Sequence, residues 1–280
     1  MKDKTILYLS GGMMSGVFGA GIVTGLEEAN AYPHIGAIYG GSAGAFNGAY
    51  FLAHQSRLGS TIYYEDLPNR FFSWNEILKG SDSAIDREFL MGIVQREKAL
   101  DVKRIQTQKI PFNIKVLNKA TGKMEYLDGK VGTIEKLKQA VGVFPFCDVN
   151  NESNVDGDIL DPVGLDYLLE RHPQEKIVLA VNYKPGFSFM RNIGDHYCGI
   201  ISATRGNEYS SFKRYFFERE RRLRRDLQKA REQERILVVC PPSTSKTASL
   251  TQDKAKLIET HKMGISTSRS IVRFMRTGRK

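Results

Sequence analysis

A serine between two regularly spaced glycines is the residue pattern with the clearest chemical meaning in this chain. In "YGGSAGAFNGAY", residues 39–50, Ser42 lies two residues from both Gly40 and Gly44. This is the spacing of a nucleophile elbow, in which a sharp strand-to-helix turn exposes the serine hydroxyl and the glycines avoid collisions with neighbouring backbone. An ordinary glycine-rich turn is the alternative interpretation. If the elbow is present, Ser42 needs a base to take its proton and N–H groups to hold an oxyanion.

A second glycine-rich turn, "GGMMSG" at residues 11–16, precedes the first helical pattern. A Walker-type phosphate loop would require Lys and Ser or Thr where Val17 and Phe18 stand. A Rossmann fingerprint fails too, because Gly19-x-Gly21 lies inside the helical pattern and no acidic residue follows at the required distance. Backbone N–H groups at a strand-to-helix turn can instead stabilise a developing negative charge. This turn is therefore expected to form an oxyanion hole.

The base is predicted to be an aspartate rather than a histidine. None of the five histidines (His34, His54, His172, His196 and His261) lies in a local motif. Asp156, in "VDGDILDPV" at 155–163, is followed by glycine and precedes a proline. Such a segment can sit at a loop tip with its carboxylate facing a pocket, although an ordinary Asx turn has the same residues.

The elements around these motifs alternate between strand and helix. Apolar runs at 4–10 and 34–40 read as strands, each followed by a helical pattern, and further strands are predicted within 111–127, 175–183 and 236–242. Long helices are predicted at 214–235 and at 251–264, the latter ending at a glycine. The alternation predicts an α/β fold with three α/β/α layers and a mainly parallel sheet. An α/β-hydrolase is excluded because only 41 residues precede Ser42, too few for the strands that fold needs. One domain is expected over 1–280, with a catalytic core at about 1–205 and a basic helical extension at about 206–280.

Taken together, the three motifs resemble the patatin-like phospholipases, serine acyl hydrolases with a Ser-Asp dyad. "LSGGMMSGVFGAGIVTGLEE" is similar to the family's oxyanion segment and its helix, "YGGSAGA" to the elbow, and "VDGDILDP" to the Asp-Gly motif. The resemblance implies that Asp156 takes the proton of Ser42 and later activates water, with no metal or cofactor. It also implies that Gly11, Gly12 and Met13 form the oxyanion hole. The glycines of the elbow and of the Asp-Gly motif would be Gly40, Gly44 and Gly157.

Three residues depart from the family pattern. Met13 stands where the third glycine is usual, Ser15 where a basic residue is usual, and Asp158 where a second glycine commonly follows the Asp-Gly pair. If position 13 needs a positive φ, methionine strains the loop by about 1–2 kcal/mol. The missing cation is expected to affect head-group recognition or the anchoring of the loop.

Net charge is +10, and the excess of basic residues lies in the last third of the chain. Residues 213–235 carry ten basic and five acidic side chains, and "RSIVRFMRTGRK" at 269–280 carries five basic side chains and no acidic one. Either segment is a packed helix with a solvated face, or it contacts an anionic membrane surface; phospholipid is favoured over nucleic acid as the anionic partner. No targeting signal or membrane-length apolar run is visible, so a cytoplasmic protein with peripheral membrane contact is expected. Cys147, Cys198 and Cys240 form no zinc-like spacing and are expected to be reduced thiols.

The sequence thus predicts hydrolysis of fatty-acyl esters of phospholipids or lysophospholipids through an acyl-enzyme. Two alternatives remain open: a small-ester or thioester hydrolase with the same dyad, and a catalytically weakened patatin fold that binds anionic lipid or nucleic acid.

Overall fold

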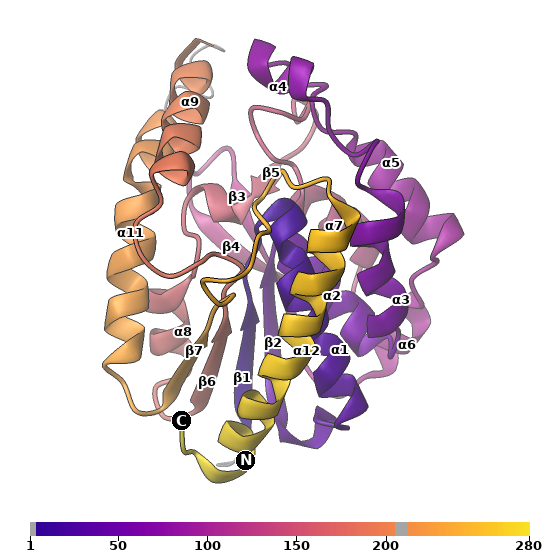
Figure 1. Cartoon of the computed structure of the whole chain (residues 1–280), viewed down its shortest axis with the longest axis vertical. Coiled ribbons are helices and arrows are strands. Elements are labelled where there is room, and N and C mark those ends of the chain that lie inside the picture. Colours follow the sequence, from indigo (N-terminus) through magenta and orange to yellow (C-terminus); the bar gives the residue numbers. More distant parts are fainter. Residues whose placement is uncertain (1–3, 205–211) are drawn as a thin grey trace.

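A seven-stranded sheet forms the centre of the protein (Figure 1). The computed structural model describes residues 4–204 and 212–280. The strand order is β4-β3-β2-β1-β6-β7, and β5 also pairs with β3. Strands β3, β2, β1, β6 and β7 run parallel, whereas β4 and β5 are antiparallel to β3. The strands are β1 (Thr5–Leu9), β2 (Ile35–Gly41), β3 (Phe112–Asn118), β4 (Met124–Asp128), β5 (Asn154–Asp156), β6 (Lys176–Ala180) and β7 (Ile236–Val239).

Helices cover both faces of this sheet. They are α1 (Val17–Glu28), α2 (Ala43–Leu52), α3 (Ser56–Thr61), α4 (Trp74–Lys79), α5 (Arg87–Gly92), α6 (Val102–Thr107), α7 (Thr133–Ala140), α8 (Leu165–Arg171), α9 (Phe189–Thr204), α11 (Lys213–Arg231) and α12 (Lys254–Thr277). Short helical turns include η1 (Met13–Gly16), which opens α1, and η3 (Ile62–Asp66), which follows α3.

The alternation of side chains along β1 shows how the layers are held together. Tyr8 points into one apolar cluster, which also contains Leu168 of α8 and Leu227 of α11. Leu9 points the other way, into a larger cluster that includes Phe18 of α1 and residues of α2 and α12. Figure 1 shows the same division, with α8 and α11 on one side of the strands and α1, α2 and α12 on the other. The predicted three-layer α/β/α fold with a mainly parallel sheet is confirmed.

The C-terminal helix is longer than the sequence pattern predicts. Gly264 does not end it; α12 begins after the Asp253 cap and continues to Thr277. A Cβ atom at Gly264 would lie 2.2 Å from the Phe18 carbonyl oxygen of α1, so glycine is retained there because two helix backbones touch. The apolar residues of the basic tail, Ile271 and Phe274 among them, are fully buried against the protein.

The predicted division into a catalytic core and a C-terminal extension can be compared with the structure only in part. The proposed boundary between core and extension, near residues 205 and 206, lies outside the described residues. Beyond it, β7 adds a strand to the sheet and α12 packs along α1. Helix α9 was not predicted. Within residues 4–204 and 212–280, every helix is too short or too polar to cross a lipid bilayer.

The contact between α1 and α12 leads to a stability prediction. Gly264→Ala would lower the free energy of unfolding by about 1–3 kcal/mol, because the new methyl group overpacks the helix crossing. Gly194→Ala in α9 is the matched control, since nothing lies within 4 Å of a Cβ there. Alanine at that control position favours the helix by roughly 0.5–1 kcal/mol. Urea unfolding of the two variants measures the difference, and equal stabilities would contradict the close contact.

Candidate active site

Ser42 occupies a strained turn between β2 and α2. Its backbone has φ 48° and ψ −127°, a conformation that a non-glycine residue rarely adopts. A Cβ at Gly44 would lie 2.1 Å from the Leu9 carbonyl oxygen, and one at Gly40 would lie 2.7 Å from the Ala45 Cα. Both glycines are therefore needed for the close passage of this turn over its neighbours, as expected of a nucleophile elbow.

Asp156 is the last residue of β5, and not the tip of an exposed loop. Pairing of β5 with β3 sets Asp156 opposite Val116, and the side chain is buried. Burial raises the pKa of the carboxyl group to about 7, helped by the negative charge of Asp158 and opposed by the hydrogen bond from the Asp158 N–H (N···Oδ1 2.8 Å) and by the neighbouring Ser42 hydroxyl. The structure therefore brings the two predicted dyad residues into contact, in a site dry enough to make the carboxylate basic.

The oxyanion segment lies directly against the serine. Gly11 is so close that a Cβ there would be 2.5 Å from the Ser42 Cβ. Gly12 has φ 140° and Met13 has φ 50°, so position 13 adopts the left-handed backbone that favours glycine. Ser15, in place of the usual cation, donates its hydroxyl to the Gly12 carbonyl oxygen at 2.6 Å and so anchors the loop.

The three predicted oxyanion donors are not equivalent. The Gly11 N–H donates to the Asp158 carboxylate (N···Oδ2 2.8 Å) and is thus occupied. Within the described residues, the N–H groups of Gly12 and Met13 have no acceptor. Gly12 caps η1 and Met13 begins it; η1 leads into α1, and the N-terminal end of a helix favours a negative charge. Two of the three N–H groups are therefore available to an oxyanion.

A fully buried ion pair links this loop to the dyad strand. Lys115 of β3 has no solvent exposure, and its Nζ lies 2.7 Å from Asp158 Oδ1. The same ammonium group donates to the Tyr8 hydroxyl and, at 2.6 Å, to the Asp161 carbonyl oxygen. Two hydrogen bonds and one ion pair thus offset the cost of placing this charge in a dry interior. Asp158 consequently joins β3, the dyad segment and the Gly11 amide.

Asn182, two residues after the end of β6, holds the oxyanion segment from its other side. Its side-chain amide donates to the carbonyl oxygens of Ser10 (2.6 Å) and Gly11 (3.1 Å). Its side-chain oxygen accepts the N–H of Gly19 at 2.8 Å. One asparagine therefore fixes the position of the loop relative to α1.

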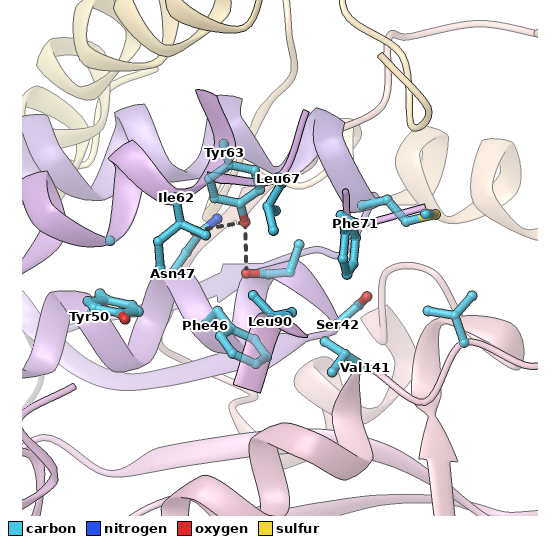
Figure 2. Close-up of a pocket in the computed structure, with 14 residues that line it drawn as sticks. Ser42, Phe46, Asn47, Tyr50, Ile62, Tyr63, Leu67, Phe71, Leu90 and Val141 are labelled. Atoms are coloured by element: carbon cyan, nitrogen blue, oxygen red, sulfur yellow. Dashed lines mark hydrogen bonds between the residues drawn. The ribbon is translucent and has the colours of Figure 1, made fainter. Parts of the chain in front are cut away.

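An apolar pocket begins at Ser42 and runs along α2 (Figure 2). Its empty volume, open mouth included, is about 530 Å³. Ser42 and Tyr50 mark its length, since eight residues of helix correspond to about 12 Å along the axis. Tyr63 closes one side, where its hydroxyl donates to the Asn47 side chain at 3.1 Å. The remaining lining is Met13, Ala43, Phe46, Gly59, Ile62, Leu67, Phe71, Leu90, Val141 and Val143.

The histidines and cysteines lie in other surroundings. His261 of α12 faces Thr24, His172 bonds to the Tyr39 hydroxyl, and the ring of His196 contacts its own helix. The three cysteines are free thiols. The described residues hold no group of three or more His, Cys, Asp or Glu side chains that could bind a metal ion.

Sequence reasoning missed Lys115 and Asn182, and only Asn182 had a usable signal. An asparagine that follows the buried strand "IVLA" lies at the carboxyl edge of a parallel sheet, where functional groups gather. Lys115 is one lysine among many, and the amino-acid sequence of its strand does not show that both faces of the strand are buried. Its role became visible only through its contact with Asp158.

Fold and site together define an α/β protein with a serine on a nucleophile elbow. The family model described as "Patatin-like phospholipase" matches residues 7–169, more than half of the 280-residue chain. The chain belongs to the patatin-like phospholipase family, whose general activity is the hydrolysis of lipid acyl esters. Among solved structures, the crystal structure of VipD from Legionella pneumophila matches with 11% sequence identity and a TM-score of 0.46. That match covers 97% of this chain and 67% of the VipD chain. No curated protein gives a significant match.

The buried ion pair yields a prediction about stability. Lys115→Met would leave the Asp158 carboxylate buried without its counter-charge, which typically lowers the free energy of unfolding by about 3–5 kcal/mol. The double variant Lys115→Met/Asp158→Asn removes both charges and is expected to recover most of that loss. Urea unfolding of the wild type and these variants measures the effect. A double variant no more stable than Lys115→Met would contradict the pairing.

Proposed function

We propose that this protein hydrolyses fatty-acyl esters of phospholipids or lysophospholipids through a Ser42–Asp156 dyad and an acyl-enzyme. The observation that carries the proposal is the placement of the strained Ser42 beside a buried carboxyl group whose pKa is raised to about 7. Such a carboxylate can act as a general base near neutral pH without a histidine.

In the first half-reaction, Asp156 accepts the hydroxyl proton as Ser42 Oγ forms a bond to the ester carbonyl carbon. The N–H groups of Gly12 and Met13 stabilise the resulting oxyanion, and each such donor typically contributes roughly 3–4 kcal/mol to the transition state. The tetrahedral intermediate then loses the alcohol, which takes the proton from Asp156. In the second half-reaction Asp156 deprotonates a water that attacks the acyl-enzyme, and Ser42 regains a proton as the fatty acid leaves.

The apolar pocket supports an acyl chain as the group transferred to serine. It opens at Ser42 and its walls are apolar side chains, with few polar groups beyond Asn47, Tyr50 and Tyr63. A chain lying along α2 would exclude water from those walls, which is the main driving force for binding an alkyl group.

The decisive test is release of fatty acid from mixed phospholipid and lysophospholipid vesicles. Asp156→Asn is expected to lower kcat about 10²–10⁴-fold, the usual contribution of a general base. Ser42→Ala is expected to abolish turnover, because no nucleophile remains. Asp148→Asn serves as a matched control, since Asp148 is an exposed aspartate on the preceding loop.

Full activity in either dyad variant would refute the mechanism. Turnover of short esters alone would favour the small-ester alternative. If the wild type hydrolysed no ester at all, the binding-module alternative would be favoured.

The raised pKa of Asp156 predicts the pH dependence. The base is active when ionised, so kcat/KM for a soluble short-chain ester should rise with pH and level off above about 7. In Asp158→Asn a neighbouring negative charge is gone, so the ionised form of Asp156 becomes easier to reach and the midpoint should move to lower pH. A pH–rate profile of both proteins checks the direction, and an unchanged or higher midpoint in the variant would contradict it.

A further inference from the structure

Helix α9 places several large apolar side chains in solvent, although other apolar residues of the helix, Ile201 among them, pack against the core. Its buried residues are Asp195, Gly199 and Ser202. Its solvent side carries Phe189, which is 65% exposed, and Ile200, which is 60% exposed. Surface helices of soluble proteins normally place the apolar stripe against the core and the polar stripe in water. The solvent side of α9 is therefore more apolar than that of an ordinary surface helix.

This apolar face extends beyond α9. The Phe217 ring of α11 lies against His196 and over Gly199, which brings α11 to the edge of the α9 face. Of the ten exposed large hydrophobic side chains in the described residues, six belong to this one surface. We call it the apolar rim, formed by Phe187, Phe189, Met190, Ile193, Ile200 and Phe217. Single exposed apolar residues are common, whereas a contiguous group marks an interaction surface.

The inner side of α9 adjoins the dyad segment. The Arg219 guanidinium of α11 donates to Asp195 of α9 at 3.1 Å and to the Asp158 carbonyl oxygen at 3.0 Å. Tyr197 of α9 donates its hydroxyl to the carbonyl oxygen of Leu78 in α4 at 2.8 Å. Figure 1 shows α9 and α4 at the end of the molecule toward which β1 and β2 run, the end where Ser42 lies. The apolar rim is thus the outer face of an element whose inner face is connected to the site through Arg219.

Basic side chains border the apolar rim. Between residues 213 and 225 the exposed side chains of α11 include five basic residues and one acid. Arg221 is 78% exposed, and the Arg224 guanidinium lies 5.4 Å from the centre of the Phe187 ring. An apolar face flanked by cations fits the boundary between phosphate head groups and acyl chains. A second copy of the chain fits less well, because each copy would bring the same excess of arginine to the contact.

We propose that the apolar rim docks this protein on anionic phospholipid bilayers. Phe189, Ile193 and Ile200 enter the head-group boundary, while Arg221 and Arg224 meet the lipid phosphates. The proposal rests on the proposed acyl-hydrolase function for its purpose, since docking there would bring the Ser42 end of the sheet to the substrate. Binding itself requires no turnover and can be measured separately.

Binding is tested with Ser42→Ala protein and sedimented vesicles of phosphatidylcholine with or without phosphatidylglycerol. Adding Phe189→Ser, Ile193→Ser and Ile200→Ser together should weaken binding to anionic vesicles at least tenfold. Arg221→Gln/Arg224→Gln should weaken it severalfold on anionic vesicles and reduce its salt dependence. Val131→Ser, at an exposed apolar residue outside the apolar rim, is the control and should bind normally. Unchanged binding by the triple serine variant would overturn the proposal.

The same triple variant with Ser42 intact separates docking from chemistry. It should hydrolyse a soluble short-chain ester at the wild-type rate and vesicle lipid at least tenfold more slowly. Vesicle hydrolysis at the wild-type rate would overturn the docking proposal while leaving the dyad in place. If the wild type cleaves no ester but the triple variant still loses vesicle binding, the proposed function fails and the docking surface stands. Light scattering that shows a wild-type dimer lost in the variant, with vesicle binding unchanged, would assign the apolar rim to a second copy and overturn the proposal.

Discussion

The site depends on two interactions of the Asp158 carboxylate, one with the Lys115 ammonium group and one with the Gly11 N–H. This carboxylate joins three segments that are distant in the sequence: the oxyanion turn, strand β3 and the dyad strand. Its charge also raises the pKa of Asp156, so the group that positions the loop would also favour the proposed role of Asp156 as a base. A buried charge of this kind is tolerated only because Lys115 balances it inside the same dry space.

Strain at Ser42 and Met13 follows from this arrangement. Both residues have a positive φ, which is unfavourable for side chains other than glycine, and both lie where the chain turns from a strand into a helix. The surrounding contacts hold them in place: Asn182 and Ser15 fix the first turn, and the close glycines of the elbow fix the second. The rigid turns then direct the hydroxyl and two free N–H groups toward one apolar pocket.

Arg219 extends the same network to the molecular surface. It connects the carbonyl group of Asp158 with Asp195 on the inner side of α9, and its third contact is the Tyr183 hydroxyl at 2.8 Å. Asp195 faces inward to make this connection, while Phe189 and Ile200 of the same helix lie in solvent. One side of α9 is therefore connected to the site, and its other side is a candidate surface for lipid.

The sequence by itself determined the alternation of strands and helices, the elbow at Ser42 and the position of the Asp-Gly motif, because these depend on local periodicity and on glycines at short spacing. It predicted the ordered motifs of the family, and it named Met13 as the residue that would be strained if its position needed a positive φ, which the structure shows it does. Tertiary structure decided the rest. Gly264 resembles a helix end in the sequence, yet it is a helix–helix contact, since only packing shows what a missing Cβ avoids. The ion pair of Lys115, the contacts of Asn182 and the exposed apolar side of α9 also depended on tertiary structure, because a side chain's partner and its burial depend on segments far away along the chain.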